Sequence, residues 1–251
     1  RGADPVAEND SHGQYLYAVA EVWRHTRDKA WLARHWPTVQ RVLAYQEGLR
    51  QSERSARNRE SGREHLFGLM PPSISHEGYS DKAAYSYWDD FWALRGYKDA
   101  LQIARVLGHE TEAQRWSAWT ASFERELTAS ITATAAHHRI DFIPGAADRG
   151  DFDPTSTTIA LNPVQADLPP ALLAATFERY WRESLARTLG QREWKDYTPY
   201  ELRSVGALAR MGQGARAHAM LDFFFRDRRP AAWNQWAEVV RPGYRERGFI
   251  G

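Results

Sequence analysis

Apolar residues recur at every third or fourth position over most of this chain, which is the spacing of one face of an α-helix. The first such run lies within residues 15–26 and ends near Thr26. The second follows Asp28, and Pro37 within it predicts a kink or a restart of the helix. Because so few residues separate the two runs, they predict an antiparallel helical hairpin.

A second pair of helices is predicted in the middle of the chain. One begins near Ser86 and ends at Gly108, since glycine readily takes the left-handed conformation that follows many helices. The other carries apolar residues at helical spacing over residues 113–131. This pair echoes the first after about 80 residues, and a repeat of that length is typical of stacked helical hairpins.

The helical spacing is interrupted around residues 138–163. Residues 141–144 and 157–161 predict short extended segments on either side of the acidic loop 148–153. That loop holds three aspartates, which raises the question of a calcium site. A calcium ion needs roughly six or more oxygen ligands, so we interpret this segment as a hydrogen-bonded loop instead.

The last third of the chain predicts a regular helix over residues 172–185 and a third hairpin over residues 198–224. Thr198, Pro199 and Glu201 occupy the N-cap, N1 and N3 positions of a capping box, which gives Glu201 a structural role. The predicted fold class is therefore all-α, with stacked helical hairpins and one short extended insertion.

One predicted helix start combines aromatic rings with two adjacent carboxylates. Asp90 heads the apolar stripe and is flanked by Trp88 and Trp92, where a carboxylate is costly to bury without a partner or a task. Asp89 lies about 100° around the helix and can close a capping box onto Ser86. Both acids also suit the positive end of the helix dipole, so a structural and a catalytic interpretation stay open.

Composition narrows the classes of partner. The 33 Lys and Arg against 32 Asp and Glu give a net charge of +1, which does not provide the basic surface that nucleic acid needs. The chain has no cysteine, so disulfides and thiolate metal sites are excluded, and we predict no metal and no cofactor. No run of about 18 apolar residues predicts a membrane span.

The two ends of the sequence suggest how the chain relates to a longer protein. The first residues lack the apolar core of a signal peptide, and the last ones close on no helix. We therefore interpret the chain as a single helical domain over residues 1–251 that is a fragment of a longer protein, whose remaining part would be a partner. The compartment is left open by the sequence, with an extracytoplasmic location, periplasmic or secreted, as our hypothesis.

Several short motifs occur in an order that resembles one enzyme superfamily. They are Gly68-Leu69-Met70-Pro71, Tyr87-Trp88-Asp89-Asp90, Asp153-Pro154-Thr155-Ser156 and Trp233-Asn234-Gln235-Trp236-Ala237-Glu238. The first two resemble Gly-Leu-x-Pro and Trp-x-Asp segments of six-hairpin glycosidases, with Asp90 at the Trp-x-Asp position. The third resembles the Asp-x-(Ser/Thr) loop that borders the sugar site, and the last resembles a late Trp/Glu segment.

This resemblance, to α-L-rhamnosidase-like, glucoamylase-like and trehalase-like enzymes, implies a fold and an activity. The implied fold is part of an (α/α)6 toroid, which is incomplete here because about half of the family's helices are present. The implied activity is an inverting glycoside hydrolase that acts on an oligo- or polysaccharide through paired carboxylates. No segment of this chain matches the general-acid glutamate of the family.

The resemblance also implies site residues. The candidate catalytic residues are Asp90, Glu238 and Asp89. The candidate carbohydrate-binding residues are Asp10, His12, Trp88, Trp92, Asp153, Trp233 and Trp236. Glu238 is favoured as the second carboxylate because water activation in inverting enzymes needs a group roughly 6.5–9.5 Å from the acid, which two residues within one helical turn do not provide.

Two other functions remain open at this stage. Stacked helical hairpins also build non-catalytic modules that bind carbohydrate or protein, and these modules show the same periodicity. A polysaccharide lyase on the same toroid would need a basic side chain, for which His12 and Tyr85 are the candidates. Acids clustered at helix entrances favour the hydrolase.

Overall fold

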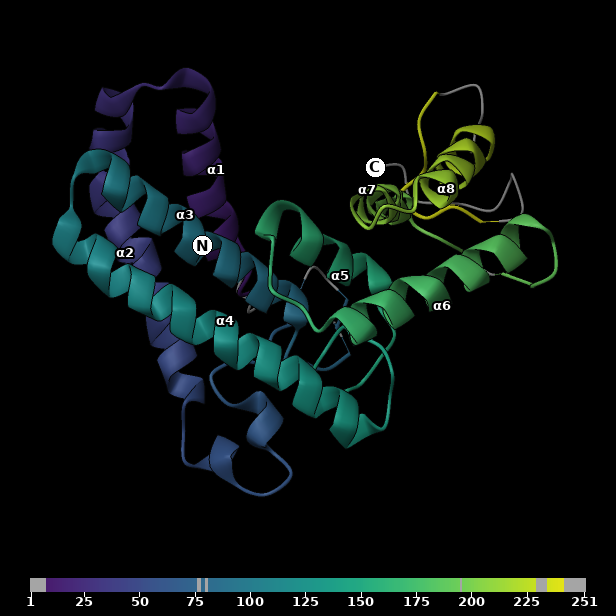
Figure 1. Cartoon of the computed structure of the whole chain (residues 1–251), viewed down its shortest axis with the longest axis horizontal. Coiled ribbons are helices and arrows are strands. Elements are labelled where there is room, and N and C mark those ends of the chain that lie inside the picture. Colours follow the sequence, from purple (N-terminus) through teal and green to yellow (C-terminus); the bar gives the residue numbers. More distant parts are fainter. Residues whose placement is uncertain (1–7, 76–77, 80, 195, 229–233, 242–251) are drawn as a thin grey trace. The chain divides into compact units, whose positions relative to one another are not determined.

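The structure is a computed structural model that describes residues 8–75, 78–79, 81–194, 196–228 and 234–241 (Figure 1). Within these residues the chain forms eight α-helices, with 68% helix and no β-strand. The all-α prediction is therefore confirmed. The chain divides into two compact units, Arg1–Pro170 and Ala171–Gly251, and each is described by itself.

The first hairpin of the first unit consists of helices α1 (Ser11–Thr26) and α2 (Lys29–Glu53). Asp28 caps α2 by accepting a hydrogen bond of 2.8 Å from the backbone N–H of Trp31, as expected for an N-cap aspartate. The predicted break between the helices is confirmed. Of the two alternatives predicted at Pro37, the restart is wrong, because α2 runs unbroken through that residue, and the kink stays a prediction.

The second hairpin consists of α3 (Tyr87–Leu107) and α4 (Glu110–His138). Gly108 takes a left-handed conformation with φ of 82° and caps α3, as predicted. Helix α3 is the centre of the unit, because it packs against α1, α2 and α4 (Figure 1). Two adjacent hairpins fit the predicted stacking, while closure into a toroid stays a prediction.

Helices α1 and α3 meet through their backbones. A Cβ atom on Gly13 would lie 1.9 Å from the carbonyl oxygen of Trp92, and one on Gly96 would lie 2.9 Å from the Cα of Gly13. Only glycine fits at position 13 without separating the helices. The two helices run in the same direction, so their N-terminal ends lie side by side.

The insertion after α4 differs from its prediction. Residues 157–161 were expected to be extended because they are rich in β-branched residues, but they lie within α5 (Pro154–Ile159) and a π-helical turn, η3 (Ala160–Val164). Asp153 accepts a hydrogen bond of 3.2 Å from the backbone N–H of Ser156, and Pro154 follows it at N1. This N-terminal pattern outweighs the strand propensity of the threonines.

The second unit holds α6 (Pro170–Thr188), a 3-10 turn η4 (Pro199–Leu202), α7 (Arg203–Arg210) and α8 (Gly214–Arg226). Helix α7 packs against α8, which agrees with the third predicted hairpin.

The capping box predicted for Thr198 and Glu201 is wrong. Thr198 makes no side-chain cap, because the segment begins with a 3-10 turn. Glu201 instead forms an ion pair of 2.7 Å with Arg187 and accepts a hydrogen bond of 2.6 Å from the hydroxyl of Tyr180. The role of Glu201 is still structural, since it ties η4 to α6.

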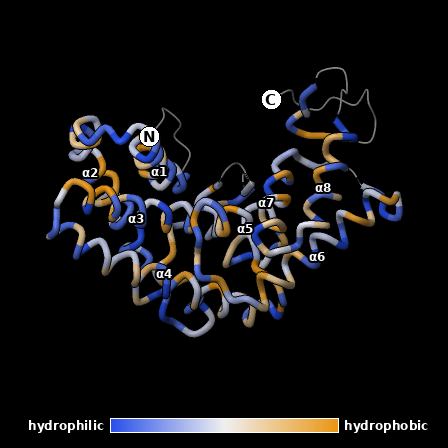
Figure 2. Tube along the Cα trace, turned by 45° about the horizontal axis from the view of Figure 1, so that its top comes forward, coloured by the Kyte–Doolittle hydropathy of each residue, from blue (hydrophilic) through white to orange (hydrophobic). Residues whose placement is uncertain are grey.

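Most of the longer helices mix apolar and polar residues at helical spacing, as predicted. Figure 2 shows hydrophobic and hydrophilic residues alternating along the helices of both units. None of the helices within the described residues is both long and apolar enough to cross a membrane.

Candidate functional site

The N-terminal ends of α1 and α3 bring three carboxylates together, which we call the acidic cluster: Asp10, Asp89 and Asp90. Asp10 directly precedes α1, and its Oδ2 accepts hydrogen bonds of 2.8 Å from Nε1 of Trp88 and 2.7 Å from Nε2 of Gln14. The close approach of the two helices therefore joins the predicted sugar-binding pair Asp10 and Trp88 directly.

Asp89 is fully buried and faces the loop that precedes α3. Its Oδ2 accepts a hydrogen bond of 2.5 Å from the hydroxyl of Ser73. The hydroxyl of Ser86 donates to that of Ser75 at 2.8 Å, and the backbone N–H of Ser75 donates to the Ser73 hydroxyl at 2.9 Å. The capping box predicted between Ser86 and Asp89 is therefore wrong, because both side chains bind the loop instead.

Asp90 is also fully buried and holds the same loop. Its Oδ1 accepts a hydrogen bond of 2.8 Å from the backbone N–H of Met70, within the Gly-Leu-x-Pro motif. Its Oδ2 has no hydrogen-bond partner among the residues that the structure describes. One oxygen of Asp90 thus has a structural partner, while the other has none.

Burial changes the protonation of these acids. Desolvation raises the pKa of Asp89 to about 7, with a further contribution from the negative charge of Asp10 and an opposing one from the Ser73 hydrogen bond. Desolvation and the charge of Asp89 raise the pKa of Asp90 well above its ordinary value. No Lys or Arg in the described part of the chain forms an ion pair with any of the three acids.

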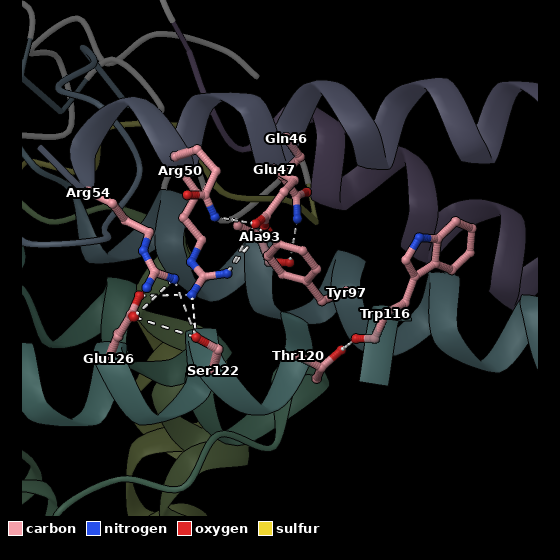
Figure 3. A network of polar contacts seen from close by, with 11 residues as sticks. Gln46, Glu47, Arg50, Arg54, Ala93, Tyr97, Trp116, Thr120, Ser122 and Glu126 are labelled. Carbon is pink, nitrogen blue, oxygen red and sulfur yellow. Dashed lines mark hydrogen bonds and ion pairs between the residues drawn. The ribbon is translucent and has the colours of Figure 1, made fainter. Parts of the chain in front are cut away.

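A second buried network in the same unit has the opposite character, and we call it the ion network: Glu47, Arg50, Arg54 and Glu126 (Figure 3). Arg50 is fully buried and pairs with Glu47 at 3.2 Å and with Glu126 at 2.8 Å. Arg54 pairs with Glu126 at 3.2 Å, and the hydroxyl of Tyr97 donates to Glu47. The ion network links α2, α3 and α4, which is a structural role.

The Gly-Leu-x-Pro motif connects the two networks. Gly68 has a left-handed conformation with φ of 76°, and a Cβ atom there would lie 2.3 Å from Oε2 of Glu126. Two residues later, Met70 donates to Asp90. The motif therefore contacts the ion network at its first residue and the acidic cluster at its third.

Two other predicted sugar-binding residues lie near the start of the same helices. The ring of His12 lies 4.9 Å from that of Tyr45. The ring of Trp92 lies 5.6 Å from that of Tyr17 and 6.1 Å from that of Trp88. These contacts join aromatic rings of α1, α2 and α3, and Trp88 connects them to the acidic cluster through its hydrogen bond to Asp10.

Asp153 is brought to the same end of α3 by its loop. The backbone N–H of Tyr87 donates to the carbonyl of Gly145 at 2.9 Å, and Gly145 N–H donates to the carbonyl of Asp151 at 3.0 Å. The carboxylate of Asp153 itself accepts bonds from Ser156 and Thr155 at the start of α5. Its observed role is thus to cap that helix.

The prediction of a hydrogen-bonded acidic loop is confirmed. Asp148 accepts a bond of 2.9 Å from the backbone N–H of Tyr85. Asp151 accepts bonds of 3.0 Å from the backbone N–H of Ala146 and from the hydroxyl of Tyr79. These bonds fold the loop against the segment that enters α3.

The late aromatic and acidic segment belongs to the second unit. Glu238 accepts a hydrogen bond of 3.3 Å from the hydroxyl of Tyr200, and Nε1 of Trp236 donates to the carbonyl of Phe224 at 3.0 Å. Trp233 lies outside the described residues. Because each unit is described by itself, the separation of Glu238 from the acidic cluster stays a prediction.

Tyr85 is poorly suited to the role of a lyase base. Its hydroxyl donates to Glu53 at 2.7 Å, and burial together with this carboxylate raises the pKa of Tyr85 to about 12. A tyrosine base needs the opposite shift, because it must lose its proton near neutral pH.

Three histidines that were not predicted as metal ligands lie together, and we call them the histidine cluster: His65, His137 and His138. One ring nitrogen from each lies within 4.8 Å of the others. His65 is buried on the turn η2 (Glu64–Leu66), and the other two end α4. The adjacent histidine pair at a predicted helix end was the only signal in the sequence.

A surface pocket of about 860 Å³ lies on the outer face of α4. Its lining is mostly alanine and threonine, and it includes none of the predicted site residues. The acidic cluster is thus defined by its buried contacts and not by this pocket.

No family model, no curated protein and no solved structure matches the chain. The class that the structure establishes is an all-helical protein, and no family is identified. Any function must therefore be argued from the residues themselves.

Proposed function

We propose that this chain is part of a glycoside hydrolase that acts on an oligo- or polysaccharide with inversion. The observation that carries the proposal is the acidic cluster: two adjacent, fully buried carboxyl groups with raised pKa and no cationic partner among the described residues, beside the hydrogen-bonded pair Asp10 and Trp88. Such an arrangement destabilises a fold, and it is found preferentially where chemistry requires it.

The proposed mechanism uses two carboxyl groups on opposite faces of the sugar. A carboxylic acid from the Asp89 and Asp90 pair protonates the glycosidic oxygen while the bond from that oxygen to the anomeric carbon breaks. A pKa near 7 suits Asp89 to hold its proton until that step. Glu238 removes a proton from the water that attacks the anomeric carbon, so the product has the inverted configuration.

The remaining predicted residues would bind the sugar. Trp88 and Trp92 offer apolar ring faces, and Asp10 and His12 offer polar groups at the same helix ends. An apolar ring with a polar group beside it fits the two kinds of surface that a pyranose presents. Asp153 would act through its loop, which packs on the first residue of α3.

The test is sugar release from a panel of nitrophenyl glycosides and polysaccharides. Asp89→Asn and Asp90→Asn are expected to cut kcat by about a hundredfold or more, with little change in Tm at about pH 4, where both acids are protonated in the folded parent. Glu238→Gln is expected to abolish turnover while sugar binding persists. Asp81→Asn is the matched control, because Asp81 is an exposed acid that pairs with Arg149. Parent rates in all the site variants would refute the proposal.

A second candidate function is a non-catalytic module that binds carbohydrate or protein. The observation that favours it is that neither Asp89 nor Asp90 has any exposed surface, so a substrate would reach them only after the loop over them moves. Calorimetry separates the candidates: a sugar that binds without turnover, and with the same affinity in Asp90→Asn, identifies the module.

A further inference from the structure

We propose that the histidine cluster is a binding site for a divalent transition-metal ion of the zinc class, formed by His65, His137 and His138. The geometry is the first support. One ring nitrogen of each histidine lies within 4.8 Å of the others, and movements of about 1 Å bring three nitrogens to the roughly 3.3 Å separation of ligands around tetrahedral zinc. Imidazole is a preferred ligand of zinc, copper and nickel ions.

The rings are held in place before any ion binds. The His65 and His137 rings are stacked with centroids 4.4 Å apart, and the His137 and His138 rings meet edge to face at 4.8 Å. The backbone carbonyl of His65 accepts a hydrogen bond of 2.5 Å from the hydroxyl of Ser130, which fixes η2 on α4. A prearranged set of ligands loses little conformational entropy on binding.

The hydrogen bond made by His138 is one that suits a metal ligand. Nε2 of His138 lies 2.9 Å from the carbonyl oxygen of Ala147, and since a carbonyl only accepts, Nε2 carries the proton and Nδ1 carries the lone pair. Metal-binding histidines commonly donate their other ring N–H to a backbone carbonyl in this way.

The loop at Gly150 packs closely on His138. A Cβ atom on Gly150 would lie 2.5 Å from Cγ and 2.8 Å from Nδ1 of His138, so only glycine allows this close packing on the ring. The positive φ of 66° at Gly150 also favours glycine there. His137 is exposed, which gives an ion a path from solvent.

The consequence of binding follows from where the ligands lie in the chain. His65 begins the segment that continues through Met70 to Ser73, the partners of Asp90 and Asp89. An ion held between η2 and the end of α4 would fix this segment from its N-terminal side. Three protein ligands also leave a fourth position for water, as in open zinc sites.

The test uses the full chain, stripped with a chelator and titrated with Zn²⁺ by calorimetry, and separately with Co²⁺ by absorption spectroscopy. We expect one ion per chain and the strong visible bands of four-coordinate Co²⁺. His137→Ala removes an exposed ligand and is expected to weaken Zn²⁺ binding by at least about tenfold. His218→Ala, an exposed histidine on α8, is the matched control and should bind like the parent.

A second variant tests whether a loss of Zn²⁺ binding could come from misfolding. His65→Asn changes a buried ring, so its circular dichroism and Tm are measured without metal before the titration. With excess Zn²⁺ the Tm of the parent and of His218→Ala should rise, and that of His137→Ala and His65→Asn should not. Equal Zn²⁺ affinity in the parent and in His137→Ala, or no binding by the parent, overturns the proposal.

Discussion

The ion network and the acidic cluster are both buried in the first unit, and both contact the loop that begins at Gly68. In the ion network, Arg50 lies between Glu47 and Glu126, so each buried charge has an opposite charge nearby. In the acidic cluster, carboxyl groups neighbour one another and their pKa values rise. A buried charge that is paired with an opposite charge has a structural explanation. Buried carboxyl groups that lie next to one another lack this explanation and are more typical of functional sites.

The largest effect is expected from breaking the ion network. Arg50→Met leaves the buried Glu47 and the half-buried Glu126 with less compensating charge, and should lower the free energy of unfolding by about 3–5 kcal/mol. Denaturant unfolding measures this change. Arg54→Met is the control, since Arg54 is partly exposed, and should cost less than about 1 kcal/mol. Equal losses in both variants would contradict the structural role of Arg50.

The effect of pH on the stability of the fold should be opposite for the acidic cluster and for a carboxylate in an ion pair. Because the pKa of Asp89 is raised from 3.8 to about 7 in the folded protein, folding takes up a proton between these values, and stability falls as pH rises through that window. The loss is at most about 4 kcal/mol and is complete above pH 7. Asp89→Asn should remove this part of the decline, as seen by unfolding at pH 4, 6 and 8. A parallel pH curve in the variant would exclude a raised pKa.

The approach of α1 to α3 sharpens the comparison, since it brings Asp10 to Asp89. Gly13→Ala places a methyl group 1.9 Å from the carbonyl oxygen of Trp92, so the helices must separate, at a cost of about 1–3 kcal/mol. Gly48→Ala is the matched change, because no atom lies within 4 Å of its added Cβ, and should stabilise by about 0.5–1 kcal/mol. A stable Gly13→Ala variant would contradict the backbone contact.

The smallest effect is expected from Asp10→Asn. The amide oxygen still accepts from Trp88, so stability at acid pH should change by less than about 1 kcal/mol. The negative charge that raises the pKa of Asp89 is lost, so the pH window of the preceding decline should move to lower pH. Unfolding curves of Asp10→Asn and Gln14→Ala separate the charge of Asp10 from its hydrogen bonds, because Gln14→Ala should leave the window in place.

The helical periodicity and the capping residues predicted much of the fold from the sequence. The boundaries at Asp28 and Gly108 are local, because an N-cap and a left-handed C-cap depend on a few neighbouring residues. The errors lie where distant residues compete with a local pattern. Ser86 and Asp89 had the spacing of a capping box, but the serines of the preceding loop supplied other partners.

The candidate site was predicted only in part. Asp10 and Trp88, both predicted to bind sugar, meet through a hydrogen bond, whereas Ser73 and Ser75 were missed because a serine in a loop carries no sequence signal of burial. The histidine cluster was missed for a related reason: His65 lies 137 − 65 = 72 residues before the His137 and His138 pair, and only folding brings them together.

The backbone contact between Gly13 and Trp92 also has a consequence during synthesis on the ribosome. The partner surface of α1 is made 92 − 13 = 79 residues later, which takes roughly 4–16 s at the usual 5–20 residues per second. Through that interval α1 lacks the surface of α3 on which Gly13 packs. The entrance that holds Asp10 is therefore completed only once α3 emerges.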